Sequence, residues 1–126
     1  VRGEVLHNFN YVNTMQDGQL LLLDGGAEAQ SGYATDVTRT WPVSGSFSNR
    51  QRNAYEAVLE AQLNSIALVR PGTRYRDVHL ESARIIAQFL ADENLIHCSP
   101  DEAIETGATV LFAVVGLAFL IKAIGG

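Results

Sequence analysis

The sequence predicts an α+β domain in which antiparallel strands come first and helices follow. Two observations carry this prediction. Up to residue 43, apolar runs alternate with turn-forming residues, whereas from residue 48 onward apolar residues recur at the three- and four-residue spacing of helices. Strands followed by helices are typical of the α+β class. With 126 residues, 47% of them hydrophobic and 18% charged, the chain can form one domain with a hydrophobic core.

Three strands are expected in the first third of the chain. Residues 1–7 favour a short strand, and residues 19–24, QLLLLD, are a continuous apolar run typical of a buried strand. Gly25-Gly26 then permits a sharp exit. Residues 33–43 alternate polar and apolar side chains and favour a third strand. We expect the three strands to pair as an antiparallel meander.

Two long helices and one short helix are expected next. Residues 48–69 begin with a serine suited to cap a helix and precede a Pro-Gly pair that ends it. Residues 75–91 predict a second helix, and Ser99-Pro100 predicts the start of a short one that stops at Gly107. The predicted inward-facing stripe of the first helix consists of Tyr55, Val58, Leu59, Leu63 and Ile66.

Two aspartates stand out because each closes or interrupts a strand segment. Asp24 ends the leucine run, and Asp36 lies 12 positions later. A carboxylate at the end of an apolar strand is costly to bury unless a positive group meets it. No lysine or arginine lies between the two positions, and Arg39 is expected on the strand face opposite Asp36. A divalent metal is the simplest partner for the pair, while a turn role before Gly25 is the alternative for Asp24 alone.

Thr38 is expected to share a strand face with Asp36, since residues two apart on a strand point the same way. A hydroxyl near a carboxylate suits an outer-shell partner that orients a metal ligand. The alternative is a solvent-facing edge with paired threonines. His7, just before the turn into the leucine run, could polarise a substrate carbonyl or transfer a proton, or be structural.

The remaining metal-binding residue types form no recognisable site. His79 is expected at the edge of the core, beside the apolar stripe of the second helix. His97 and Cys98 lack the further partners that a zinc site needs.

Composition excludes some functions. The net charge of −5 and the pI near 5.0 argue against binding a nucleic-acid backbone, which needs a basic face. One cysteine excludes an intrachain disulfide and fits a reducing compartment, so we expect a cytoplasmic protein.

Residues 108–121 are uncharged but are fewer than the roughly 20 that span a bilayer. A buried strand or helix is therefore favoured there over a membrane segment. The chain begins at Val1, and we expect a piece of a longer protein.

The pattern D-x-G-x-E…Y-x-x-D-x-T-R-T-x-P-V-x-G, within LLLLDGGAE…GYATDVTRTWPVSGSFSNRQRNAYEAVLEAQ…VRPGTRYRDVH, resembles the catalytic domain of Xaa-Pro aminopeptidases. These belong to the pita-bread metallopeptidase family M24, with methionine aminopeptidases and prolidases. The resemblance runs over residues 1–112 and implies a partial pita-bread (creatinase/aminopeptidase-like) fold. Residues 113–126 depart from the family pattern and are expected to form a separate apolar tail.

The resemblance implies roles for four residues. Asp24 corresponds to the first metal-ligand aspartate of the family, and Asp36 corresponds to the second, which bridges two metals. His7 matches a histidine near the substrate, which makes it the candidate catalytic residue, and Thr38 is an outer-shell residue. The implied cofactors are two divalent ions, with Mn²⁺ favoured and Co²⁺ or Zn²⁺ as alternatives. The implied substrate is a peptide with an Xaa-Pro N-terminus.

The end of the chain departs from this pattern. Two family histidines fall on Val115 and Phe119, and the two glutamate ligands belong to later strands. We therefore expect weak or no metal binding by the chain alone, together with dimerisation or aggregation through apolar surface that the missing half would cover. The expected function is a fragment of a dinuclear metal-dependent aminopeptidase, inactive in isolation. The alternative is a non-catalytic binding or dimerisation module derived from the same fold.

Overall fold

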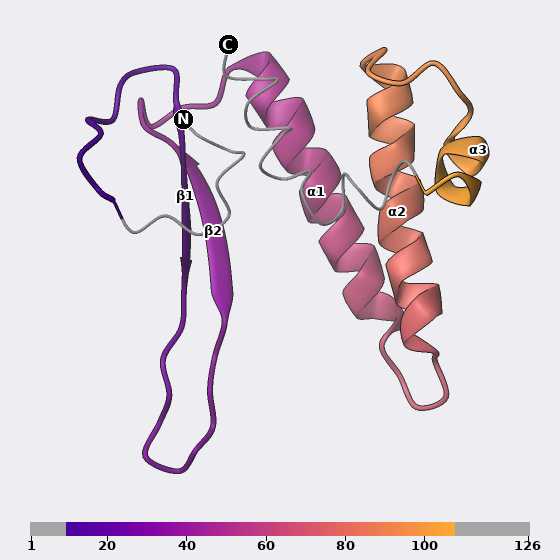
Figure 1. Cartoon of the computed structure of the whole chain (residues 1–126), viewed down its shortest axis with the longest axis horizontal. Helices are drawn as coiled ribbons and strands as arrows, with labels where there is room; N and C mark the ends of the chain where they lie inside the picture. The colour runs from indigo at the N-terminus through magenta and orange to yellow at the C-terminus, as the bar shows by residue number, and fades with distance from the viewer. Residues whose placement is uncertain (1–9, 108–126) are drawn as a thin grey trace.

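The computed structural model describes residues 10–107 as a β-hairpin followed by three helices (Figure 1). The elements, in chain order, are β1 (Leu20–Gly25), β2 (Val37–Pro42), α1 (Asn49–Leu68), α2 (Tyr75–Asp92) and α3 (Pro100–Glu105). Figure 1 shows α1 between the hairpin and α2, with α3 on the far side of α2. The predicted α+β class is confirmed. The strand expected at residues 1–7 and the tail expected at 113–126 lie outside the described residues.

β1 and β2 pair antiparallel in a register that runs from Leu20 opposite Pro42 to Gly25 opposite Val37. The strand predicted over residues 33–43 is therefore shorter than expected and begins after Asp36. Between the strands the chain forms a long loop in which Glu28 and Ala34 make an isolated bridge. Gly26 is needed in this loop, because a Cβ there would fall on the carbonyl oxygen of Thr35.

The prediction that the leucine run forms a buried strand is wrong for the described part of the chain. Leu21 and Leu22 are each 38% exposed and Leu23 is 53% exposed. Trp41, opposite Leu21, is also exposed. A strand becomes buried only when other layers cover its faces. Within residues 10–107 the hairpin forms a two-stranded sheet, so the apolar run meets no such layer.

α1 begins with a complete capping box. The hydroxyl of Ser48 accepts a hydrogen bond from the backbone N–H of Gln51, and the Gln51 side chain accepts one in return from the N–H of Ser48. Gln51 is buried, and its amide also donates to the carbonyl of Gly18 at 2.8 Å, which ties α1 to the start of the hairpin. The predicted N-cap is thus confirmed.

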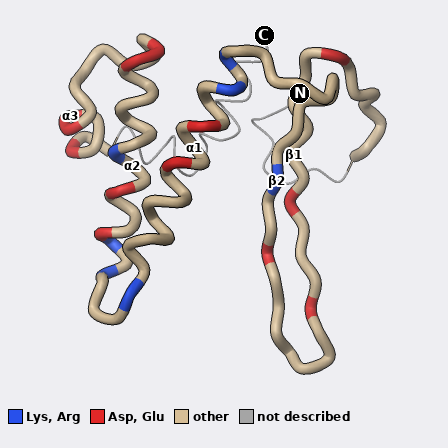
Figure 2. Tube along the Cα trace, turned by 180° about the vertical axis from the view of Figure 1, so that it is seen from behind, with Lys and Arg blue, Asp and Glu red and all other residues tan. Residues whose placement is uncertain are grey.

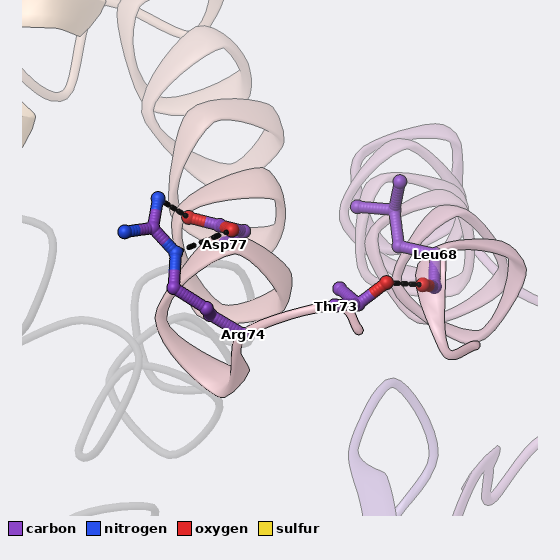
Figure 3. Close-up of polar contacts among 4 residues, drawn as sticks. All are labelled: Leu68, Thr73, Arg74 and Asp77. Atoms are coloured by element: carbon purple, nitrogen blue, oxygen red, sulfur yellow. Dashed lines mark hydrogen bonds and ion pairs between the residues drawn. The ribbon is translucent and has the colours of Figure 1, made fainter. Parts of the chain in front are cut away.

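The turn between α1 and α2 is held by side chains (Figure 3). The Thr73 hydroxyl donates to the carbonyl of Leu68 at 2.8 Å, which satisfies one of the orphan acceptors at the end of α1. Arg74 forms two hydrogen bonds with Asp77 in the first turn of α2. Asp77 also places negative charge near the positive end of the helix dipole.

The core lies between the helices. Ala54 of α1 packs with Phe89 and Leu90 of α2, and Ile96 of the following loop packs against them. Farther along, the hydroxyls of Ser65 and Ser82 hydrogen-bond across the α1–α2 contact at 2.6 Å. Ser99 caps α3 with Pro100 at its first position, and Gly107 takes a positive φ of 73° just past its end, both as predicted.

The predicted inward stripe of α1 is mostly wrong. Val58 is half-buried against the core, but the other four residues face outward. The buried positions of α1 are Gln51, Ala54 and Ala61 instead. Small side chains permit the close approach of α2, so the alanines are the buried apolar residues of this contact, and Val58 packs beside them. None of the helices in residues 10–107 combines the length and apolar character that a bilayer-spanning helix needs.

Candidate metal centre

The two aspartates singled out by the sequence line one hollow. Asp24 is the fifth residue of β1, and Asp36 immediately precedes β2 on the returning arm of the hairpin. Both contribute to an open hollow of about 500 Å³ beside the hairpin. Its lining residues are Asp24, Asp36, Val37, Thr38, Arg39 and Gln62. The antiparallel return of the chain thus brings together carboxylates 12 positions apart.

Thr38 orients the carboxylate of Asp24. The register places Thr38 directly opposite Asp24, so that the two side chains share one face of the sheet. The Thr38 hydroxyl donates a hydrogen bond to Oδ1 of Asp24 at 2.7 Å. A carboxylate keeps several lone pairs after accepting one hydrogen bond, so this contact leaves Asp24 able to bind a cation. The sequence predicted Asp36, two residues earlier on the same strand, as the partner of Thr38. The structure instead gives Asp24 of the neighbouring strand as the acceptor, because β2 begins only at Val37 and the register sets Thr38 opposite Asp24.

Among the residues that the structure describes, positive side chains do not neutralise the two aspartates. Within residues 10–107, neither Asp24 nor Asp36 takes part in an ion pair. Arg39 contributes to the hollow, but its guanidinium donates to the carbonyl of Thr38 at 2.8 Å. Figure 2 shows acidic residues on both arms of the hairpin. The hollow therefore concentrates negative charge that a cation would balance.

Gln62 was not anticipated in the hollow. It comes from the middle of α1, on the same side as the apolar residues that face away from α2. Its position in the helical repeat predicts the side of α1 on which Gln62 lies. The sequence does not predict which side of α1 faces the hairpin. Gln62 therefore enters the hollow through the tertiary arrangement of helix and hairpin.

Other sequence candidates stay apart from the hollow or outside the described residues. His7 belongs to the undescribed residues, so its predicted catalytic role has no structural counterpart here. His79 is half-buried on α2, as expected for a residue at the edge of the core, and His97 lies exposed in the loop after α2. Cys98 is a free thiol. The part of the chain that the structure describes holds no group of three or more potential metal-ligating side chains.

The donor set fits part of a divalent-metal site. Carboxylate oxygens suit hard and borderline cations such as Mg²⁺ and Mn²⁺, and an outer-shell hydroxyl fixes the orientation of such ligands. Two carboxylates leave most coordination positions to water or to other protein groups. Asp24 and Asp36 can therefore contribute ligands to a metal centre, whose other positions would be filled by water or by groups outside residues 10–107.

Residues 1–98 match metallopeptidase family M24. Xaa-Pro aminopeptidase 1 of Streptomyces coelicolor is 42% identical over 102 residues, which cover 81% of this chain and 21% of that protein. Xaa-Pro aminopeptidase of Escherichia coli is 40% identical over 115 residues, covering 91% of this chain and 26% of that protein.

Solved structures of aminopeptidases also match this chain. Zinc-substituted Escherichia coli aminopeptidase P in complex with product superposes with a TM-score of 0.78 at 40% identity, over 84% of this chain and 24% of that one. Pseudomonas aeruginosa aminopeptidase PepP superposes equally well, with a TM-score of 0.78 at 35% identity. The chain spans about a fifth to a quarter of the length of the relatives that it matches.

Proposed function

Because the chain belongs to metallopeptidase family M24, we propose that it is part of a dinuclear metal-dependent aminopeptidase that removes the first residue from peptides with proline in second position. The relatives named Xaa-Pro aminopeptidase support this substrate class. The observation that carries the proposal is the shared hollow, in which Asp24 and Asp36 come together and Thr38 holds the carboxylate of Asp24.

Four residues of the chain have a defined task in this proposal. Asp24 and Asp36 would bind divalent metal ions, with Asp36 bridging two of them. Thr38 holds Asp24 in one orientation through its hydrogen bond of 2.7 Å. His7 would lie near the substrate. The chemistry that bound divalent ions supply is activation of water near neutral pH.

Mn²⁺ is the proposed native metal, with Co²⁺ or Zn²⁺ as alternatives, because these ions accept mixed carboxylate and imidazole ligands. Escherichia coli aminopeptidase P has been solved in a zinc-substituted form, which supports zinc as an ion that this relative accepts. Two carboxylates rarely hold an ion tightly. We therefore expect gel-filtered chain to carry well below one equivalent of metal by elemental analysis, and a tightly held stoichiometric ion would contradict this expectation.

A chimeric enzyme tests the function directly. Residues 10–107 would replace the aligned segment of the Escherichia coli Xaa-Pro aminopeptidase, which supplies the rest of the catalytic domain. The chimera should cleave an Xaa-Pro peptide in the presence of Mn²⁺, because the described segment superposes on that fold. Asp24→Asn or Asp36→Asn in the chimera should lower kcat/KM by more than about a hundredfold, beyond the usual loss for an outer-shell partner.

Thr38 provides a graded control in the same chimera. Thr38→Val removes the hydroxyl with little change of shape and should cost about 10- to 100-fold in activity or metal affinity. Thr38→Ser keeps the hydroxyl and should stay near the unsubstituted chimera. A fully active Asp24→Asn or Asp36→Asn variant would disprove the assigned ligand roles. A folded chimera without activity would instead favour a non-catalytic binding or dimerisation module.

Two further proposals concern the chain as a whole. The single cysteine is a free thiol, which supports a reducing compartment, and we place the protein in the cytoplasm. The proposed peptidase portion comprises residues 1–112 and the proposed tail comprises residues 113–126. The match of residues 1–98 to the family supports the first part of this division.

A further inference from the structure

The close contact of Asp24 and Thr38 follows from the place of this pair in the hairpin ladder. The backbone N–H of Val43 donates to the carbonyl of Gln19, directly opposite it, at 2.9 Å. Hydrogen-bonded and non-hydrogen-bonded pairs alternate along an antiparallel ladder, so Asp24, five positions after Gln19, belongs to a non-hydrogen-bonded pair with Thr38. The side chains of such a pair approach each other most closely, whereas its backbone groups point away from the neighbouring strand.

The backbone carbonyl of Thr38 therefore points to the outer edge of β2. The sheet has two strands within residues 10–107, so no third strand of this range meets the carbonyl. The guanidinium of Arg39 meets it instead, because its Nη1 donates to the carbonyl oxygen at 2.8 Å. A charged donor makes a stronger hydrogen bond than a neutral one, although the net contribution of such a bond in water is modest. Arg39 thus holds the peptide group on the outer side of Thr38.

Arg39 lines the hollow together with Asp24 and Asp36, yet it forms an ion pair with neither of them in the part of the chain that the structure describes. A positive charge beside a cation site weakens the site through Coulomb repulsion. An arginine at this position is therefore unfavourable for metal binding unless it contributes in another way. The hydrogen bond to the Thr38 carbonyl is such a contribution, because it holds the residue that orients Asp24.

We infer that Arg39 is a positioning residue of the metal centre and that it acts through Thr38. By fixing the carbonyl of Thr38, Arg39 fixes the backbone from which the Thr38 hydroxyl reaches Oδ1 of Asp24 at 2.7 Å. Because Asp24 is a metal ligand only in the proposed function, this role of Arg39 rests on that proposal. Loss of a direct partner of a metal ligand costs about 10- to 100-fold in metal affinity, so loss of a residue one step farther away should cost less.

The direction of the change in metal affinity separates positioning from a simple effect of charge. Arg39→Met removes the guanidinium and keeps a long unbranched side chain. If charge alone mattered, this variant would bind Mn²⁺ more tightly, because a repulsive charge is gone. Positioning predicts the opposite, a dissociation constant about three- to tenfold higher, as for a residue one step removed from a metal ligand. Arg39→Lys keeps a charged donor and should stay within about twofold of the unsubstituted chain.

Titration of the full chain with Mn²⁺ measures these dissociation constants. The electron paramagnetic resonance signal of the free ion follows binding even where it is weak, and circular dichroism establishes that folded chains are compared. Arg52→Met is the matched control, since Arg52 is also an exposed arginine and forms an ion pair with Glu56 of the same helix at 3.9 Å. The control should bind Mn²⁺ like the unsubstituted chain. Unchanged or tighter binding by Arg39→Met would overturn the inference.

A double-mutant cycle tests whether Arg39 acts through Thr38. In a chain that carries Thr38→Val, the hydroxyl that Arg39 positions is already gone. Adding Arg39→Met to this chain should therefore change the dissociation constant for Mn²⁺ by less than about twofold, because the two substitutions interrupt the same contact. If Arg39→Met weakened binding as much in this background as in the unsubstituted chain, Arg39 would act by another route and the inference would be wrong.

A measurement without metal separates the role of Arg39 from the proposed function. The three-bond coupling between Hα and Hβ of Thr38 in the NMR spectrum shows whether its χ1 angle is held in one rotamer or averaged over several. We expect one rotamer in the unsubstituted chain and averaging in Arg39→Met, while the coupling of Thr40, on the same face of β2, stays unchanged. An unchanged Thr38 coupling in Arg39→Met would overturn the inference. Averaging at Thr38 without Mn²⁺ binding by any variant would instead contradict the proposed metal centre, and not the positioning of Thr38.

Discussion

The carboxylate of Asp24 is oriented by its cross-strand neighbour. Asp24 pairs with Thr38 in the hairpin register, and the hydroxyl of Thr38 donates to Oδ1. A slip of one residue would turn Thr38 to the opposite face of the sheet and remove this hydrogen bond. The register of two short strands therefore determines which atoms of Asp24 can approach a cation.

Gly26 determines how closely the two arms of the hairpin approach beside this site. A Cβ at Gly26 would collide with the backbone carbonyl of Thr35, whereas a Cβ at Gly25 would meet only a side-chain carbon of Leu23 at 3.8 Å. Gly26→Ala should therefore displace the backbone and cost about 1–3 kcal/mol of hairpin stability, as overpacking does. Amide resonances of Thr35 and Asp36 in a two-dimensional NMR spectrum should shift. Gly25→Ala is the matched control, and equal shifts in both variants would contradict this account.

At the scale of elements, α1 depends on its N-terminal cap. Ser48 and Gln51 satisfy each other's backbone N–H groups, and no acidic residue of the first turn assists the helix dipole. Ser48→Ala should lower the free energy of unfolding by about 1 kcal/mol, the usual cost of losing a serine cap. Urea denaturation followed by helical circular dichroism measures this change.

Ser46→Ala is the control for the cap, because Ser46 lies in the same loop and accepts a hydrogen bond through its carbonyl and not its side chain. Its effect on the free energy of unfolding should stay within about 0.5 kcal/mol, as for most surface substitutions. A control variant as destabilised as Ser48→Ala would show that the loop, and not the capping hydroxyl, is responsible.

The packing of the helices depends on one large side chain. Leu90 is 0% exposed and lies in the cluster with Ala54 and Phe89. Leu90→Ala would leave a cavity there and should cost about 2–5 kcal/mol of unfolding free energy. Val12→Ala, at a site 80% exposed, should change it by less than about 0.5 kcal/mol. Thermal and urea unfolding give both values, and a loss below about 1 kcal/mol for Leu90→Ala would place the core elsewhere.

At the scale of the whole molecule, we expect the hairpin to be less stable than the helices. The helices share a buried cluster, whereas the hairpin leaves its leucines and Trp41 exposed. A two-stranded hairpin is marginal in water without a covering layer. Native-state hydrogen exchange should therefore show amides of Leu21 and Arg39 opening at least a hundredfold more often than that of Leu90. Equal protection would mean that other parts of the chain cover the sheet.

This expected difference in stability bears on the proposed function. The metal-binding aspartates proposed above belong to the hairpin, so their relative positions depend on the less stable part of the described chain. A metal that binds both carboxylates would stabilise the hairpin by mass action. The proposed remainder of the domain would do the same by covering its faces.

Local signals predicted the elements well. Ser48, Ser99-Pro100 and Gly107 act within one helical turn, so they specify helix ends without reference to the rest of the fold. The pairing of the leucine run with the following alternating segment was also correct, although the second strand is shorter than predicted. The stripe of α1 was wrong because helical periodicity identifies apolar sides but not which of them meets a neighbour. Ala54 and Ala61 are the buried apolar residues on the side of α1 that meets α2, and Tyr55, Leu59, Leu63 and Ile66 are left exposed.

By itself, the sequence determined the α+β class, the helix ends and the aspartate pattern that assigns the chain to its family, because these depend on local chemistry and motif spacing. Only the tertiary structure decided that Thr38 bonds Asp24, that Gln62 reaches the same hollow and that the stripe of α1 faces away from α2. Each of these relates residues from different elements, and such relations follow from register and packing geometry. Periodicity within a single element contains no information about them.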